Sequence, residues 1–462
     1  MLTAESDHLA AFIAKMTSAG LQPVVMDTFA WYYHKVVTGE KGFIYNRDIR
    51  PVEPHDIADS TTFAPYADIG REMMPQAVMI VLNGGLGTSM GLTGAKSLLP
   101  ARNGKTFLEI IVRQADHQRV RLALMNSFNT HAETVVALER LQPAQLPLLF
   151  VQNKFPKILR RDFSPAEWPC QPDLEWNPPG HGDIYTALYT SGILDQLLSD
   201  GIQYAFIANS DNLGATLDPS LLGYFAEKSL PFMMEVSIRK PVDIKGGHLA
   251  VHKNGHLILR EAAQCTEEEI AVSRDITRYR YFNTNNIWIN LKRLKAVFDR
   301  YGVIHLPMIL NPKTLDPRDS ASPEIYQVET AMGSAISLVE GAAAVVVPRS
   351  RFYPVKKCNE LLVIRSDRFI YSDQNGLQAN RERLGEQIQV DLDPRYYTMI
   401  DAFDARFPFG PPSLAACESL TVSGNVFFGK NIALKGNVVI RHSGGAAGYI
   451  PDDKVIEGTL SL

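Results

Sequence analysis

Short apolar runs alternate with helical patterns of apolar residues from about residue 76 to residue 365. Short segments of mostly apolar residues are typical of buried strands, and they occur at 78–82, 121–125, 148–151, 204–208, 232–238, 286–289 and 344–347. Apolar residues at helical spacing predict helices at 107–118, 131–141, 185–198, 291–300 and 326–338. This alternation predicts an α/β fold with a mostly parallel, doubly wound sheet flanked by helices, in which ligands bind at the carboxyl ends of the strands.

The two ends of the chain follow other patterns. Near the N-terminus, Leu9, Phe12, Ile13 and Met16 have helical spacing and predict a packing helix. Residues 43–66 are rich in proline and aspartate, so we expect them to run extended over the surface. We therefore expect an N-terminal segment that packs on the core, an α/β domain, a connecting segment and a C-terminal unit, at residues 1–75, 76–365, 366–412 and 413–462.

Apolar residues near the C-terminus recur at every sixth position. One series is Leu414, Leu420, Val426, Ile432 and Val438; a second is Ala416, Val422, Phe428, Leu434 and Ile440; Gly424 and Gly436 lie on a third. Interleaved series of this period predict a short parallel β-helix, and an antiparallel meander is the alternative. Fewer than two coils cannot bury a continuous core, so we expect this unit to dock on the α/β domain, on a second subunit, or on both.

Composition limits the function classes. The 462 residues are 45% hydrophobic and 21% charged with a net charge of −4, which is ordinary for a globular protein and predicts no general affinity for nucleic acid or membranes. The four cysteines are far apart and form no CxxC pair, which argues against a metal cluster or a disulfide scaffold and fits a reducing compartment. No secretory signal or apolar run of about 20 residues occurs, so we expect a cytoplasmic protein.

A glycine-rich loop follows the first predicted strand, in the sequence VMIVLNGGLGTSMGLTGAKS at 78–97. Five glycines fall within eleven residues before Lys96, and a helical pattern begins at Phe107. Such a loop exposes backbone N–H groups to a phosphate, although a plain strand-to-helix turn is the alternative. A Walker A loop would need glycine where Ala95 stands, and the glycine spacing does not fit the dinucleotide fingerprint G-x-G-x-x-G. The loop therefore predicts a nucleotide site of another kind.

Three further motifs carry candidate chemistry. PPGHGDI at 178–184 presents His181 before a helix, where it can meet an anion. YAFIANSDNLG at 204–214 places Asp211 just after a strand, where a carboxylate can hold Mg²⁺ beside a phosphate; an Asx turn is the alternative. FNTNNIWIN at 282–290 offers amides that can bind sugar hydroxyls, and Glu261, after the apolar residues 257–259, can accept hydroxyl protons.

A basic cluster follows the last predicted strand, in the sequence VPRSRFYPVKK at 347–357. It contains Arg349, Arg351, Lys356 and Lys357 in a chain of net negative charge. A solvated basic surface is the alternative, but four cations after one strand favour neutralisation of phosphates.

These segments together resemble the eukaryotic type of the UTP–glucose-1-phosphate uridylyltransferase family, the UDP-glucose pyrophosphorylases. LNGGLGTSMG with Lys96, LMNSFNT, PPGHGD, ANSDNLGA, KGGHL, FNTNN and VPRSRFYPVK occur in the order found in that family, from about residue 78 to residue 440. The resemblance implies a central nucleotidyltransferase domain of glycosyltransferase-A-like topology and a C-terminal β-helix. Both agree with the prediction from the residue pattern.

The resemblance also implies a role for each matching residue. Uracil would meet the backbone of the loop after the first strand, with Gln152 and Gly180; the loop residues are Leu82, Asn83, Gly84 and Gly85. Lys96 would hold the nucleotide phosphates and Asp211 would bind Mg²⁺. His181 and Lys356 would hold the phosphate of the sugar phosphate. Glucose would contact Gly247, Glu261, Asn283 and Asn285.

The implied reaction joins UTP and glucose 1-phosphate to give UDP-glucose and pyrophosphate. A UDP-sugar or UDP-N-acetylhexosamine pyrophosphorylase is the nearest alternative, and the GGLGTSMG loop and FNTNN argue against it. A non-catalytic nucleotide-sugar sensor is a second alternative, against which the presence of Lys96, Asp211 and Lys356 argues. We expect no nucleic-acid or membrane partner, and a homo-oligomer formed through the C-terminal unit is possible.

Overall fold

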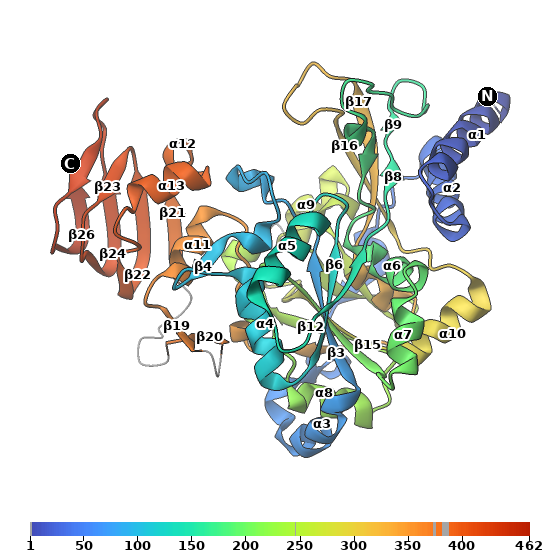
Figure 1. The fold of residues 1–462 in the computed structure, drawn as a ribbon, viewed down its shortest axis with the longest axis horizontal. Helices are drawn as coiled ribbons and strands as arrows, with labels where there is room; N and C mark the ends of the chain where they lie inside the picture. The colour runs from blue at the N-terminus through green and yellow to red at the C-terminus, as the bar shows by residue number, and fades with distance from the viewer. Residues whose placement is uncertain (1, 245, 373–375, 381–387) are drawn as a thin grey trace.

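A large sheet runs through the middle of the molecule, with helices on both faces (Figure 1). The computed structural model describes all of the 462 residues except 1, 245, 373–375 and 381–387. The strand order of the main path is β2-β18-β12-β15-β11-β3-β6-β7. In that order the strands span Ala58–Asp59, Ala343–Val346, Phe232–Ile238, Tyr281–Asn290, Tyr204–Asn209, Ala77–Asn83, Arg121–Asn126 and Leu148–Val151.

Most neighbours along the main path of this sheet are parallel, as the sequence predicts. Among the strands of the main path, only β15 is antiparallel to its neighbours β11 and β12. Each of the seven strands predicted from apolar runs overlaps an observed strand. All seven residues of β3 are buried, because helices cover both faces of a sheet of this kind.

Three of the predicted helices are confirmed nearly to the residue: α4 (Phe107–Gln118), α5 (His131–Leu141) and α10 (Leu291–Tyr301). The predicted helix at 185–198 is two helices, α6 (Ile184–Thr190) and α7 (Ile193–Ser199). Gly192, between them, has a φ of +77°, which ends one helix and redirects the chain. The helices α3 (Ala67–Met73), α8 (Pro219–Glu227) and α9 (Ile270–Ser273) complete this region.

The predicted helix at 326–338 is wrong. Residues Glu324–Thr330 form β17, which pairs antiparallel with β16 (Met308–Thr314), and a 3-10 helix follows at Met332–Ser337. Ile325 and Val328 are buried three residues apart, a spacing that both a helix and an irregularly packed strand can show. The pairing with β16, which is not apparent from the residue pattern, decides between the two. A third strand, β9 (Ile158–Leu159), completes this small sheet.

The N-terminal segment contributes three α-helices, of which α3 is the last, and two short strands. Helices α1 (Leu2–Ser18) and α2 (Pro23–Val37) pack through Phe12 and Phe29, and Phe29 contacts Phe155 of β8 (Phe155–Pro156) at 5.4 Å between ring centroids. The expectation that residues 43–66 run extended is confirmed only in part, because 3-10 turns interrupt the segment at Asn46–Asp48, Pro54–Asp56, Ser60–Thr62 and Ala64–Tyr66. The segment also joins the sheet, because β1 (Ile49–Pro51) pairs with β13 (His248–His252) and β2 pairs with β18.

The α/β domain also contains further short strands. They are β4 (Pro100–Arg102), β5 (Lys105–Thr106), β10 (Trp176–Asn177) and β14 (Leu257–Arg260). Strand β10 pairs with β8, and β14 pairs with β13. Helix α11 (Cys358–Arg365) and the hairpin of β19 (Phe369–Ser372) and β20 (Gly376–Ala379) lead toward the C-terminal unit.

The C-terminal strands pair in parallel, which excludes an antiparallel meander for the described residues. One sheet has the order β21-β22-β24-β26, and its strands span Gln389–Leu392, Ser413–Ser423, Ala433–Arg441 and Val455–Ser461. A second sheet pairs β23 (Val426–Phe428) with β25 (Gly448–Ile450). Leu420 lies opposite Val438, eighteen residues on, as three six-residue edges per coil predict. Strand β21 lies within the segment expected to be a connector.

The inward positions match the period-six series with one exception. All five members of the first series are buried, and four of the second are. Ala416 is exposed, because the β22–β24 register shifts on both sides of it and Cys417 is buried instead. Helices α12 (Pro394–Tyr397) and α13 (Ile400–Arg406) lie beside these strands (Figure 1).

We expect Phe428→Asp to destabilise the C-terminal unit. Phe428 is 2% exposed and stacks on Phe407 with 4.6 Å between ring centroids, so a carboxylate there would be buried without a partner. Loss of the ring alone costs about 3–5 kcal/mol, so the melting temperature should fall by several degrees. Phe427→Asp is the matched control, since Phe427 is only half-buried. Equal melting temperatures of the Phe428 variant and wild type, with unchanged size-exclusion profiles, would contradict the period-six interpretation.

Candidate active site

The glycine-rich loop after β3 folds back on itself and brings Lys96 to the end of β11. The Lys96 backbone N–H donates to the Gly85 carbonyl at 3.0 Å, and the Ala95 N–H donates to Glu133 Oε2 of α5 at 2.8 Å. The Lys96 Nζ lies 2.7 Å from Asp211 Oδ2. The two predicted residues are therefore an ion pair, formed because β3 and β11 are parallel neighbours that end at the same edge of the sheet.

Asp211 presents one carboxylate oxygen that the protein does not use. Its Oδ2 accepts from Lys96, while its Oδ1 is buried and has no hydrogen-bond partner among the described residues. The side chains of Lys96 and Asp211 are 12% and 16% exposed. An unpaired buried carboxylate oxygen is costly, and so it marks a place for a ligand or an ion.

Gln152, at the end of β7, lies over the start of the glycine loop. It is buried, and its Nε2 is so near Gly84 that a Cβ at that glycine would lie 2.9 Å away. Leu82 is buried at the end of β3. The side chain of Asn83 is already engaged, because its Nδ2 donates to Asn126 Oδ1 and Thr134 Oγ1 at 2.8 and 2.9 Å. The Nδ2 of Asn83 is therefore already used within the protein.

His181 follows a glycine that permits a tight approach. Gly180 has a φ of +79°, and a Cβ there would lie 2.5 Å from the Thr330 carbonyl oxygen at the end of β17. The Met332 N–H donates to His181 Nδ1 at 3.1 Å, so the neutral ring carries its proton on Nε2. Burial, together with the charge of Lys356, lowers the pKa of His181 to about 4. His181 is thus a neutral hydrogen-bond donor at pH 7.

The predicted sugar residues lie on neighbouring strands and turns. A Cβ at Gly247 would lie 2.6 Å from Glu261 Oε2, so these two are adjacent. Burial raises the pKa of Glu261, and the charge of Lys356 partly offsets this rise. Asn283 Nδ2 donates to Asn285 Oδ1 at 2.7 Å within an irregular part of β15, where Asn285 has a φ of +59°. Lys356 therefore acts on both His181 and Glu261, which brings the two predicted halves of the sugar-phosphate site together.

The basic cluster at 347–357 is not a set of four phosphate-binding cations. Arg349 pairs with Asp243 at 2.7 Å, and Arg351 pairs with buried Glu235 at 2.7 Å. Lys357 is exposed, and its backbone N–H donates to Glu360 at the start of α11. Of the four, Lys356 has its charge directed to the predicted site. The acidic partners come from distant segments, so the sequence pattern could not reveal them.

A further carboxylate, not singled out from the sequence, links the two halves of the nucleotide site. Asp183 accepts from the Asn153 backbone N–H at 2.6 Å and from Asn153 Nδ2 at 2.9 Å. Asn153 directly follows Gln152, and Asp183 lies two residues after His181. Asp183 belongs to the PPGHGDI motif, and this motif is the only feature of the sequence that could have identified Asp183 as a site residue.

We expect Asp183 to make stability pH-dependent. Burial raises the pKa of Asp183 to about 7, above the value of about 4 of an unfolded aspartate. The folded state therefore favours the protonated form, and stability is lost as the pH rises from 4 through 7. Asp183→Asn does not titrate, so its melting temperature relative to wild type should rise by about 3 °C or more between pH 5 and pH 8. Calorimetry measures these melting temperatures, with exposed Asp173→Asn as the control. A difference between the melting temperatures of Asp183→Asn and wild type that does not change with pH would contradict the prediction.

The comparisons with known proteins agree with this geometry. Residues 26–435 match the family model described as UTP–glucose-1-phosphate uridylyltransferase. The chain belongs to this family. The enzyme of that name from Hordeum vulgare is 39% identical over 398 residues, covering 84% of this chain and 82% of the relative. The enzyme from Saccharomyces cerevisiae is 37% identical over 395 residues, covering 84% and 78%.

Solved structures extend the agreement to the whole fold of this uridylyltransferase family member. A point mutant of UDP-glucose pyrophosphorylase from Leishmania major, in complex with UDP-glucose, has a TM-score of 0.92 and 40% identity, covering 98% of this chain and 99% of that chain. The UDP-glucose phosphorylase from Trypanosoma brucei has a TM-score of 0.89 and 42% identity, covering 99% and 100%. Across the described residues, no helix has the length and apolar character needed to cross a membrane.

Proposed function

We propose that this chain joins UTP and glucose 1-phosphate to give UDP-glucose and pyrophosphate, and catalyses the reverse reaction. The observation that carries the proposal is that two charged groups, the Lys96–Asp211 ion pair and the Lys356 side chain, lie at the same edge of the sheet. The Lys96–Asp211 pair ends the nucleotide loop, and Lys356 acts on both His181 and Glu261. A nucleotide and a sugar phosphate would therefore meet between them.

The chemistry needs positioning rather than a general base. A phosphate oxygen of glucose 1-phosphate attacks the α-phosphorus of UTP, a new P–O bond forms, and the bond from that phosphorus to the bridging oxygen of the leaving pyrophosphate breaks. The second pKa of a phosphate monoester is about 6, so the attacking oxygen is already ionised at neutral pH. The protein must bring two polyanions together in line, which cations and oriented donors accomplish.

The described side chains divide this work. Lys96 would hold the nucleotide phosphates, and Lys356 would neutralise the sugar phosphate. His181 would donate from Nε2, because its Nδ1 is occupied by the Met332 N–H. Gln152 and the backbone of Gly84 and Gly85 would read uracil, while Gly247, Glu261, Asn283 and Asn285 would meet the glucose hydroxyls.

Mg²⁺ fits one carboxylate of this site. The described residues contain no group of three or more His, Cys, Asp or Glu side chains that could hold a metal alone. Mg²⁺ at nucleotide sites is commonly bound by one or two carboxylates together with substrate phosphates, and the unpaired Oδ1 of Asp211 suits that arrangement. When bound, the ion would supply positive charge to the UTP phosphates.

A substrate panel tests the proposal. Pyrophosphate release is measured with UTP and glucose 1-phosphate, galactose 1-phosphate or N-acetylglucosamine 1-phosphate, each with Mg²⁺ present and with a chelator. We expect release with glucose 1-phosphate to exceed the others and to require Mg²⁺. Preference for another sugar would indicate a broader UDP-sugar enzyme, and binding of UDP-glucose without release would indicate a sensor.

We expect Gln152→Ala to weaken base discrimination more than chemistry. A buried amide that pairs with a base edge rejects other bases because its polar atoms are left unpaired, an effect worth about 1–3 kcal/mol. The ratio of kcat/KM for UTP to that for CTP should therefore fall about tenfold or more, while kcat for UTP changes less. Exposed Gln171→Ala serves as the control. An unchanged ratio would remove Gln152 from the uracil site.

The proposal also includes an oligomeric state and a cellular location. Strand β26 ends the parallel C-terminal sheet, so among the described residues it has a strand neighbour on one side only, which supports a homo-oligomer through this unit. Light scattering of wild type and Phe428→Asp would test it. The four cysteines are free, which supports the cytoplasm as the location.

A further inference from the structure

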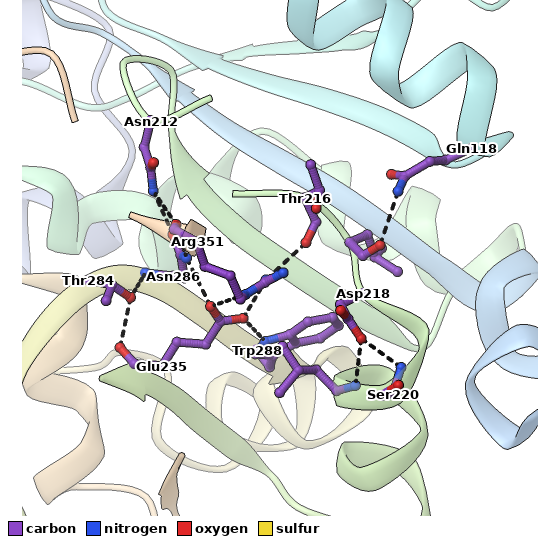
Figure 2. A network of polar contacts seen from close by, with 12 residues as sticks. Gln118, Asn212, Thr216, Asp218, Ser220, Glu235, Thr284, Asn286, Trp288 and Arg351 are labelled. Atoms are coloured by element: carbon purple, nitrogen blue, oxygen red, sulfur yellow. Dashed lines mark hydrogen bonds and ion pairs between the residues drawn. The ribbon is translucent and has the colours of Figure 1, made fainter. Parts of the chain in front are cut away.

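An ion pair between Glu235 and Arg351 lies in the core behind the candidate site (Figure 2). Glu235 is on β12 and is fully buried, and Arg351 ends the 3-10 turn Arg349–Arg351 that follows β18. The contact is bidentate: Arg351 Nε donates to Oε2 at 2.8 Å and its terminal nitrogen donates to Oε1 at 2.7 Å. A planar fork of this kind fixes the orientation of the arginine as well as its charge.

The carboxylate of Glu235 is held from a second strand as well. Trp288 Nε1 donates to Oε1 and Asn286 Nδ2 donates to Oε2, both at 2.9 Å, and both residues belong to β15. Figure 2 shows these donors converging on the carboxylate from the strand beside β12. Donors from Arg351 and from β15 therefore hold the Glu235 carboxylate in one orientation.

Asn212 connects Arg351, and through it Glu235, to the candidate site. Its Nδ2 donates to the Arg351 carbonyl at 3.1 Å, and its Oδ1 accepts from the Tyr353 N–H at 2.8 Å. The adjacent backbone is also paired, because the Val355 N–H donates to the Asp211 carbonyl at 3.1 Å. Segment 351–355 is thus held beside residues 211–212 like an extra strand.

Asp211 and Lys356 lie at the same end of these paired segments, because Lys356 directly follows Val355, whose N–H donates to the Asp211 carbonyl. We propose that Glu235 and Arg351 are positioning residues that set the separation between the Asp211 carboxylate and the Lys356 ammonium, and with it the alignment of UTP and sugar phosphate. The inference rests on the proposed function. Neither residue would touch substrate, since Glu235 is fully buried and Arg351 is engaged by Glu235 and the Thr216 carbonyl.

Stability alone does not account for this arrangement. A buried ion pair adds little net stability compared with apolar residues of similar volume, because both charges lose their hydration. What an ion pair adds is a directional constraint, and here it acts on the segment that carries a predicted phosphate-binding residue. A misplacement of about 1 Å at a reacting centre can lower turnover about 100-fold.

The first test separates positioning from packing. Arg351→Lys keeps the charge but loses the bidentate fork, and Glu235→Gln keeps the shape but loses the charge. We expect kcat for UDP-glucose formation to fall 10- to 100-fold in both, with KM for UTP changed less than threefold, at a temperature well below every melting temperature. Trp288→Phe is the matched control: it removes one donor to Glu235 without touching segment 351–355, and its kcat should stay within threefold of wild type.

A double-mutant cycle tests the route through Asn212. Asn212→Ala removes the side-chain contacts with Arg351 and Tyr353, but it leaves the donation from Asn286 Nδ2 to the Arg351 carbonyl and the Val355–Asp211 hydrogen bond. If Asn212 carries most of the coupling, as we infer, adding Glu235→Gln should lower kcat by less than threefold further, whereas independent effects would multiply. Unchanged kcat in folded Arg351→Lys, multiplicative effects in the cycle, or an equal loss in Trp288→Phe would overturn the inference. If Glu235→Gln does not fold, the cycle is run with Arg351→Lys. Absence of turnover in wild type would instead contradict the proposed function.

Discussion

Asp211→Asn is expected to leave the fold intact and to lower turnover about 100- to 1000-fold, the usual effect of losing one charge contact at a phosphate-transfer centre. The amide has nearly the same shape, but it lacks the charge that pairs with Lys96 and that a Mg²⁺ ligand supplies. The side chains of the ion pair with Lys96 are only 12% and 16% exposed, so loss of the charge should lower the free energy of unfolding by about 1.5–3 kcal/mol, too little to unfold a protein of this size. Pyrophosphate release across a Mg²⁺ titration, with calorimetry, measures both effects.

Asp218→Asn is the matched control for this variant. Asp218 lies seven residues further on, and its carboxylate accepts from the Ser220 and Leu221 N–H groups at the start of α8. Asparagine caps a helix about as well as aspartate, so the change should alter stability by less than about 1 kcal/mol and leave kcat near that of wild type. Turnover of Asp211→Asn close to wild type at saturating Mg²⁺ would remove Asp211 from the metal site.

Lys356→Met is expected to lower kcat about 100-fold or more. The side chain is exposed, so its loss should not affect folding, but it removes a cation from the place where negative charge accumulates. Lys356 also lowers the pKa of both His181 and Glu261, so the variant should raise both pKa values. Steady-state kinetics with varied glucose 1-phosphate, and the pH dependence of kcat, measure the two effects.

Lys357→Met provides the control at the next position. Lys357 is also exposed, but its charge is not among those that act on His181 or Glu261. Its kcat should remain within about threefold of wild type, since an exposed charge away from the reacting groups is screened by water. The reverse result, with Lys357 essential and Lys356 dispensable, would mean that the segment is assigned one residue out of register.

Local chemistry explains why much of the site was predictable. A buried strand needs a run of apolar residues, and its end needs polar ones, so the residue pattern alone places Asp211 and the glycine loop at strand ends. The pairing of β3 with β11 then brings Lys96 to Asp211. The six-residue period predicted the inward positions of the C-terminal strands for the same reason, because it follows from one repeated local geometry.

Contacts between distant segments explain what was not predictable. Ile325 and Val328 have a spacing that fits a helix, and only the pairing with β16 makes that segment a strand. Arg349 and Arg351 have the composition of a phosphate site, and Asp243 and Glu235 neutralise them from other segments. Ala416 follows the period of its series, but a register shift exposes it.

The sequence by itself determined the fold class, the positions of seven strands of the main sheet along the chain, and the residue types at the strand ends, because each depends on backbone preference and on burial of neighbouring side chains. Only the tertiary structure decided which charged side chains remain available to a substrate. Burial keeps His181 neutral, and Asp183 and Glu235 acquire their partners across the fold. A charge is available to a substrate only where no distant segment has already paired with it, and that depends on distances in space that the order of residues does not contain.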